Sequence, residues 1–233
     1  MYGITYNNKH SFNDLGLTTL NTRVVETPSK IKITETVPFM NGSYDFSNLY
    51  GGNCYNERTL EYEFLIKANS SSELEFKRIS VEDWLLSPNT KIPLFDDNIP
   101  GYYYKAECVN VEFEDLVNKG KLKAIFSAYP FKISTTYEGN NLWDSFNFEV
   151  DALQDTKFTV NGISNVNIYN SSAIDIEPTI IASSQFEIIL DNKKYIVESG
   201  TSKDYRFKLK KGNNNITLKG NGTIEFRFRK EVL

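Results

Sequence analysis

The chain has 233 residues, a net charge of -4, two cysteines and a single histidine. The weak negative charge excludes a globally basic nucleic-acid-binding protein, and the scarcity of cysteine and histidine excludes a disulfide framework or a histidine-rich metal site. The sequence has no apolar run of about 18 residues and no signal-peptide pattern, so we expect no membrane span and folding in a cytoplasm.

The chain begins with a polar stretch that contains the only histidine, His10. We expect this stretch to be mobile. A Ser-His-Asp triad would have to use His10, and a mobile base cannot be held in place for that chemistry. Cys54 and Cys108 are both interpreted as buried free thiols, because two cysteines alone do not make a metal site.

Alternation of apolar and polar residues predicts strands that pack one face against a core. In the clearest example, Leu60, Tyr62 and Phe64 alternate with Glu61 and Glu63. The pattern occurs in four segments, namely residues 60–66, 122–128, 205–210 and 225–229.

One segment is predicted to be helical, at about residues 72–86. Ser70 and Glu73 fit a capping box, and Ser87-Pro88 provides a stop. The apolar residues fall on two stripes, which indicates a helix packed between a sheet and a second partner such as a neighbouring subunit; the alternative is a helix broken into two short pieces. One stripe contains Leu74, Val81 and Leu85, and the other contains Phe76, Ile79 and Leu86.

Turn residues separate the predicted strands. Asn41-Gly42, Asn161-Gly162, Asn221-Gly222 and Gly51-Gly52 predict tight hairpins, because Asn and Gly tolerate positive φ. The segment Asp96-Asp97-Asn98 has the composition of a solvated turn and lacks the ligand spacing of a calcium loop.

The sequence contains no motif that points to catalysis. Phosphate-binding loops, H-E-x-x-H and G-x-S-x-G are absent. A β-sandwich glycosidase or esterase would need a convergent acid pair or a nucleophile, and none stands out. We therefore predict that the chain is not an enzyme and that it needs no cofactor or metal.

Several segments together resemble phage distal tail proteins, the hub subunits of siphophage baseplates. The likeness begins with Ser11-Phe12 and Leu15-Gly16-Leu17 and continues through Val37-Pro38, Tyr44-Asp45 and Arg58. It is dense over residues 1–131 and thinner beyond. The remaining matches are Asp14, Gly42, Tyr55, Trp84-Leu85, Leu94-Phe95-Asp96-Asp97, Tyr102-Tyr103-Tyr104, Gly120, Phe126, Tyr129-Pro130-Phe131, Phe207–Asn213 and Ile216-Thr217.

The resemblance implies a mainly β protein of two domains. Residues 1–133 would form a ring-forming, tail-tube-like β-sandwich or split barrel with one α-helix. Residues 134–147 would be a linker, and residues 148–233 a β-sandwich like a galectin or a carbohydrate-binding module. The function implied is a structural ring, a homo-hexamer at the virion tail tip. It would join the tail tube protein to a tail-associated lysin or receptor-binding protein and continue the channel through which DNA passes.

The resemblance and the composition together suggest interface residues for such a ring. Segment 38–57 is a candidate arm that reaches a neighbour, and the candidate interface residues are Tyr44, Asp45, Phe46, Tyr55 and Arg58. Glu61, Glu63 or nearby carboxylates are candidates for an acidic channel lining that repels DNA. The alternative hypothesis is a carbohydrate-binding module that adsorbs to the bacterial wall, with Trp143 as the sugar-stacking residue.

Overall fold

The computed structural model describes residues 2–49, 52–116, 119–139 and 153–233, and the chain divides into two compact units. The first unit is Met1–Lys132 with Leu233, and the second is Ile133–Val232. The predicted linker at residues 134–147 falls partly outside the described residues. The predicted domain boundaries therefore remain a prediction.

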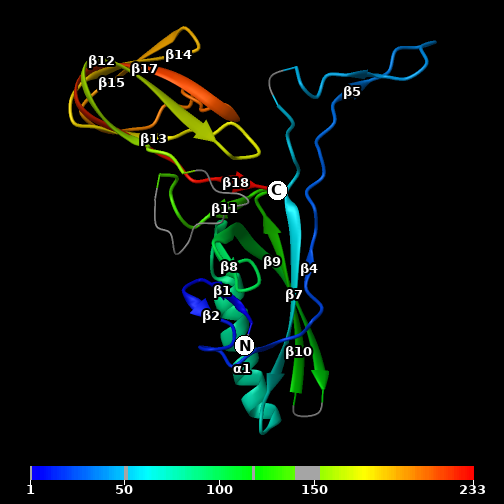
Figure 1. Ribbon diagram of the computed structural model, residues 1–233. Coiled ribbons are helices and arrows are strands. Elements are labelled where there is room, and N and C mark those ends of the chain that lie inside the picture. Colours follow the sequence, from blue (N-terminus) through cyan, green and yellow to red (C-terminus); the bar gives the residue numbers. More distant parts are fainter. Residues whose placement is uncertain (1, 50–51, 117–118, 140–152) are drawn as a thin grey trace. The chain divides into compact units, whose positions relative to one another are not determined.

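The first unit is an antiparallel sheet covered by one helix (Figure 1). The strand order is β2-β1-β8-β9-β10-β7-β3, and β4 also pairs with β7. A short pair, β5 with β6, lies outside this sheet. The elements are β1 (Ile4–Tyr6), β2 (Lys9–His10), β3 (Thr18–Thr19), β4 (Val24–Val25), β5 (Thr34–Glu35), β6 (Tyr44–Asp45), β7 (Arg58–Lys67), α1 (Ser71–Leu86), β8 (Ile92–Asp96), β9 (Tyr102–Leu116) and β10 (Lys119–Ala128).

Strands β7 and β10 form the centre of this sheet and confirm two of the predicted alternations. Buried and half-buried residues alternate along both strands. The register places Leu122 opposite Phe64 and Phe126 opposite Leu60, all of them buried. Burying aromatic and aliphatic side chains on one face gives the sheet its core, at roughly 1.5–3 kcal/mol for each fully buried side chain.

Helix α1 covers the core face and confirms the predicted helix. The hydroxyl of Ser70 accepts a hydrogen bond from the Glu73 backbone N–H at 3.2 Å, which caps the first turn. Leu74, Val81 and Leu85 are buried, as is Trp84 between the predicted stripes. The Trp84 indole donates to the Tyr6 carbonyl at 2.6 Å, so the helix is fixed to the first strand by a directed bond as well as by packing.

The second unit is also a β structure with its own core. Its sheet has the order β15-β14-β17-β13-β16, and β12 pairs with β17. Sixteen buried apolar side chains of its described residues form its core, among them Val160, Phe186, Leu218 and Phe226. The strands are β11 (Lys132–Ser134), β12 (Lys157–Asn170), β13 (Thr179–Ala182), β14 (Phe186–Leu190), β15 (Lys193–Val197), β16 (Gly200–Ser202), β17 (Gly212–Arg227) and β18 (Glu231–Val232). The mainly β fold class with one helix is confirmed.

Two of the predicted hairpin turns are wrong, because Asn161-Gly162 and Asn221-Gly222 lie inside long strands. Asn161 pairs with Asn221 in the β12–β17 ladder, and Gly162 and Gly220 have φ of 81° and 151°. At this point β17 changes its other neighbour, from β14 at residues 216–220 to β13 at residues 224–227. The positive φ that indicated a turn serves here to bend a strand pair.

The predicted strand at residues 205–210 is also wrong. Phe207 and Leu209 are buried, as the alternation requires, but the segment makes only an isolated bridge from Leu209 to Ile176. The Asp204 carboxylate accepts from the Arg206 backbone N–H at 2.9 Å. This local side-chain turn competes with a regular ladder.

Candidate assembly site

Residues 27–57 form a long excursion between β4 and β7, which we call the arm (Figure 1). Its two legs run antiparallel and are joined by backbone hydrogen bonds from Ile31 to Cys54, from Asn56 to Ser29 and from Phe46 to Ile33, each 2.8–2.9 Å. The arm thus begins about ten residues before the predicted segment 38–57. The alternation of Lys30, Ile31, Lys32 and Ile33 was the sequence signal that would have extended it.

The arm leaves apolar side chains in solvent. None of its described residues from 29 to 54 is buried. A soluble monomer rarely leaves so many large apolar groups together without cover, and such patches mark contact surfaces. The exposed apolar side chains of the arm are Ile31, Ile33, Val37, Phe39, Tyr44, Phe46 and Leu49.

Three of the predicted interface residues lie on the exposed part of the arm. The rings of Tyr44 and Phe46 are 6.2 Å apart between centroids, and Asp45 lies between them in sequence. The Asp45 carboxylate pairs with Lys32 on the opposite leg at 2.6 Å and accepts from the Ser47 backbone N–H at 2.9 Å. The hydrogen bond from Lys32 is the main reason why the pKa of Asp45 is far below its usual value. The Asp45 side chain therefore joins the two legs of the arm, and the rings of Tyr44 and Phe46 remain exposed for contact with another molecule.

The other two predicted interface residues lie at the base of the arm. Tyr55 is half-buried, with its ring 5.4 Å from that of Phe131. Arg58 is only 3% exposed; its guanidinium donates to the Pro130 carbonyl and lies 5.6 Å from the centre of the Tyr104 ring. Burial lowers the pKa of Arg58. Its side chain stabilises the interior, so we correct the prediction and remove Arg58 from the candidate interface.

A second apolar surface of the first unit lies on α1. The stripe of Phe76, Ile79 and Leu86 points away from the core, and Phe76 is 71% exposed. The opposite stripe is buried, as described above. The sequence therefore placed both stripes correctly, and none of the first unit's described residues buries the outer one.

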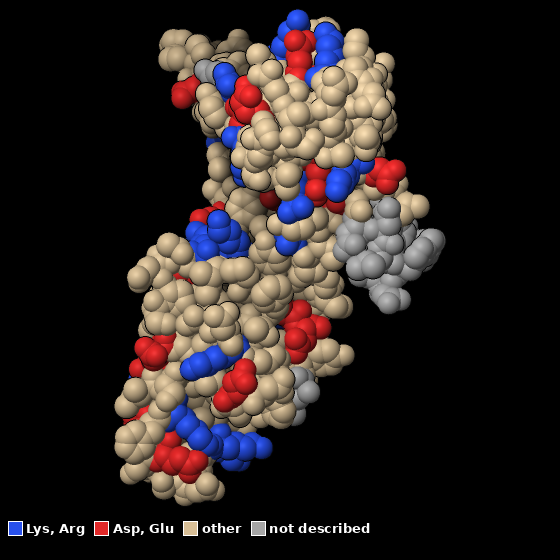
Figure 2. Space-filling view, turned by 90° about the vertical axis from the view of Figure 1, so that its left-hand side faces the viewer, with Lys and Arg blue, Asp and Glu red and all other residues tan. Residues whose placement is uncertain are grey.

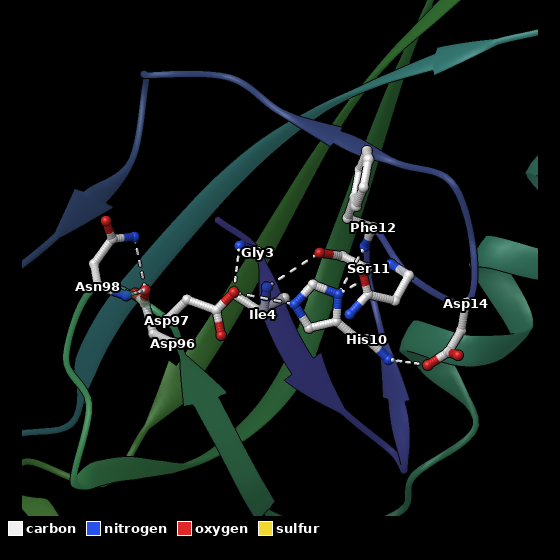
Figure 3. A network of polar contacts seen from close by, with 10 residues as sticks. Gly3, Ile4, His10, Ser11, Phe12, Asp14, Asp96, Asp97 and Asn98 are labelled. Carbon is white, nitrogen blue, oxygen red and sulfur yellow. Dashed lines mark hydrogen bonds and ion pairs between the residues drawn. The ribbon is translucent and has the colours of Figure 1, made fainter. Parts of the chain in front are cut away.

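The N-terminal stretch is held by a polar network, contrary to the predicted mobility (Figure 3). Asp97 accepts from the Gly3 backbone N–H at 2.9 Å and contacts His10 Nε2 at 3.1 Å. The Ser11 hydroxyl accepts from the Ile4 backbone N–H at 3.1 Å, and the Asp14 carboxylate from the His10 N–H at 2.6 Å. These bonds fasten residues 3–14 to the turn after β8.

The same contacts leave His10 without a catalytic function. Backbone N–H groups of Phe12 and Asn13 both donate to Nδ1 at 3.1 Å, so the ring proton lies on Nε2 and is directed at Asp97. No ring nitrogen remains to accept a proton from the Ser11 hydroxyl, which is itself fully buried. A triad built from Ser11, His10 and Asp97 therefore has the residues but not the geometry.

The prediction of a solvated turn is wrong for Asp96, because its side chain is buried and the residue is only 2% exposed. Its carboxylate accepts from the Tyr62 hydroxyl at 2.8 Å, pairs with Arg23 at 3.0 Å, and accepts twice from Asn98 at 2.9 Å. Burial, together with the Asp96 charge, raises the pKa of Tyr62 well above its usual value, so the phenol remains a donor. A pocket beside this group is lined by residues that include Thr19, Asn21, Arg23 and Asn98.

The predicted acidic lining is neutralised. Glu61 pairs with Lys123 and Glu63 with Lys121, each at 3.0 Å, on the outer face of the β7–β10 ladder. Figure 2 likewise shows acidic and basic side chains interspersed on the face it presents. Glu61 and Glu63 alone cannot supply the like-charge repulsion that was hypothesised.

The remaining candidate residues are the two cysteines and Trp143. Cys108 is a buried free thiol, whereas Cys54 is exposed on the arm, which corrects its predicted burial. Burial raises the pKa of Cys108 to about 12. Trp143, the candidate sugar-stacking residue, lies outside the described residues. No helix in the part of the chain that the structure describes is long and apolar enough to cross a bilayer.

Comparison with known proteins identifies a family model for much of the first unit and a similar fold for the whole chain. Residues 10–126, half of its length, match the family model of the phage tail protein RIFT-related domain. No curated protein matches. A solved structure that resembles the chain is the Dit protein (gp 19.1) of phage SPP1, described as a paradigm of the hub adsorption apparatus in phages that infect Gram-positive bacteria. The two share 13% identity over 100% of each chain with a TM-score of 0.66, which establishes likeness of fold. The chain belongs to the phage tail proteins that carry a RIFT-related domain, as the resemblance in the sequence indicated.

Proposed function

We propose that this phage tail protein is a distal tail subunit, and that six copies close into a ring at the tail tip. The ring would join the tail tube protein to a tail-associated lysin or receptor-binding protein and continue the DNA channel. The single observation that carries the proposal is the arm, whose apolar side chains have no cover from the described residues of the first unit. Family membership and the fold likeness to a hub protein support it.

The geometry of the first unit suits a cyclic assembly. A ring needs a heterologous interface, in which two different surfaces of each copy meet. The first unit has two such apolar surfaces, the arm and the outer stripe of α1. We infer that the arm of one copy packs on the next copy. Burying Tyr44 and Phe46 there would contribute about 3 kcal/mol or more to each interface.

The test is the oligomeric state of the full chain, measured by light scattering alone and after mixing with the tail tube protein. We expect a closed ring in at least one of these conditions. The double variant Tyr44→Ser/Phe46→Ser should remain monomeric, because a loss of about 3 kcal/mol weakens each contact more than a hundredfold. The control Tyr205→Ser/Ile196→Ser removes two apolar side chains of the second unit that are more exposed than Tyr44 and Phe46, and it should still assemble.

A second measurement locates the arm in the ring. Maleimide should label Cys54 in the monomer and leave buried Cys108 unmodified, since a pKa of about 12 keeps that thiol protonated. We expect Cys54 labelling to slow when the ring forms. A chain that stays monomeric in both conditions would overturn the proposed function, and a ring with undiminished Cys54 labelling would exclude the arm from the interface.

A further inference from the structure

The outward face of the β12–β17 ladder is rich in amide side chains. Asn165, Asn167, Asn213 and Asn215 are all exposed, and they alternate with the inward-facing Val166, Ile168, Asn214 and Ile216. The register sets Asn167 opposite Asn215 and Asn165 opposite Thr217. Side chains opposite each other in such a ladder lie about 5 Å apart at Cβ, so the four amides and the Thr217 hydroxyl form one contiguous surface.

This composition is unusual for a strand and is not explained by packing. Asn is depleted in strands, and departures from local preference of this kind occur at functional sites. The two inward Asn residues do have structural functions. Asn170 donates to the carbonyls of Ile174 and Leu209, and Asn214 donates to those of Ile168, Lys210 and Gly212. The outward ones satisfy no backbone group of the described chain.

Most hydrogen-bonding capacity of this face is unused. The described contacts are one bond from Asn167 to Asn213 at 3.3 Å and one from Thr217 to Asn165 at 2.8 Å. An amide side chain offers two donors and an acceptor, so several groups of each kind remain directed outward. Asn215 makes no hydrogen bond to another described side chain. By contrast, the outer face of the first unit is occupied by paired Glu and Lys.

The flanks of the amide face carry apolar side chains. Ile163 and Tyr169 occupy the outward positions of β12 on either side of Asn165 and Asn167, and both are exposed. They are six residues apart, roughly 20 Å along an extended strand. Beside this row, the Glu187 carboxylate pairs with Lys219 at 3.0 Å and with Lys194 at 3.6 Å, so the charged groups nearby are engaged with one another. The face therefore combines uncharged donors and acceptors with apolar ends.

We propose that this face binds a neutral oligosaccharide or polysaccharide. Vicinal hydroxyls, each both donor and acceptor, match rows of amides, and the apolar sides of sugar rings match Tyr169 and Ile163. A face about 20 Å long suits a chain of several sugars better than one monosaccharide. The site is independent of the ring, because it lies in the second unit and uses none of the arm.

The test uses the full chain on a printed array of neutral and anionic bacterial glycans. We expect capture by at least one neutral glycan, weakened at least about tenfold, or 1.4 kcal/mol, in Asn167→Ala/Asn215→Ala. The control Asn13→Ala/Asn89→Ala removes two exposed amides of the first unit that lie outside the arm, and it should bind as the parent does. Binding of anionic glycans only, capture of none, or full binding by the Asn167/Asn215 variant would overturn the proposal.

A measurement on the unmodified chain covers the case in which the double variant fails to fold. Side-chain amide resonances of Asn165, Asn167, Asn213 and Asn215 should shift when the captured glycan is added, while those of buried Asn170 and Asn214 stay in place. Shifts confined to other residues would overturn the assignment to this face. Because ring formation is measured separately by light scattering, failure of either proposal is visible without the other.

Discussion

Asp96 is the residue at which separate segments of the first unit are tied together. Its carboxylate joins Tyr62 of β7, Arg23 of the segment after β3 and Asn98 of the turn after β8. Because the carboxylate is buried, these partners replace the water that it would otherwise need. The adjacent Asp97 fixes Gly3 and His10, so one turn holds both the interior and the N-terminus.

Removing the Asp96 carboxylate should strongly destabilise the first unit. We expect Asp96→Ala to lower the free energy of unfolding by about 3 kcal/mol, since it leaves Arg23 without its charge partner and Tyr62 without an acceptor. Tyr62→Phe should lower it by about 1.5 kcal/mol, the usual contribution of a bond to a charged group. Urea unfolding followed by Trp84 fluorescence, in a Trp143→Phe background with a single tryptophan, measures both.

The double variant distinguishes a coupled group from two separate ones. Once Asp96 is absent, the Tyr62 hydroxyl has already lost its acceptor, so Asp96→Ala/Tyr62→Phe should be less destabilised than the two single losses added together. Strict additivity would contradict the network. Ser72→Ala, a change at an exposed hydroxyl on α1, serves as a control of small effect.

At the level of elements, the sequence predicts features whose causes are local. The capping box predicted α1, and alternation predicted β7 and β10, because each of these patterns depends only on residues close together in the sequence. The bend in β12 and β17 could not be found in this way. It depends on Asn161 lying opposite Asn221, and the same Asn-Gly pairs would satisfy a hairpin equally well. The burial of Asp96 likewise depends on Tyr62 and Arg23, far away in the sequence.

The bend in β12 and β17 predicts different losses in the free energy of unfolding for two glycine substitutions. Gly162 has open space where a Cβ would stand, so Gly162→Ala should lose only about 1 kcal/mol through its positive φ. A Cβ at Gly220 would lie 2.9 Å from the Gln185 carbonyl oxygen and 2.7 Å from the Phe186 ring. Gly220→Ala should therefore lose about 3 kcal/mol or more. Urea unfolding followed by far-UV circular dichroism compares them, and equal losses would contradict the crowded bend.

For the whole molecule, the charged groups make stability depend on pH. Among the described residues, six carboxylates have a lowered pKa, and in each the largest cause is a hydrogen bond from another side chain, such as that from Lys32 to Asp45 or from Thr22 to Glu63. The six are Asp45, Glu57, Glu63, Glu73, Glu187 and Asp204. Four of them belong to the first unit and two to the second.

These shifts predict that both units lose stability in acid. A carboxylate whose folded-state pKa lies below the unfolded value of about 4 binds fewer protons when folded, so its contribution is present above that pH and is lost as the pH falls through the folded-state pKa. Urea unfolding midpoints should therefore fall between pH 5 and pH 3, and the midpoint of the first unit should fall more than that of the second. Trp84 fluorescence in the Trp143→Phe background follows the first unit. Salt near 1 M should reduce the loss of stability between pH 5 and pH 3, since most of the paired groups are at the surface, where salt screens them. A first unit as stable at pH 3 as at pH 5 would show that these ion pairs do not stabilise the folded state.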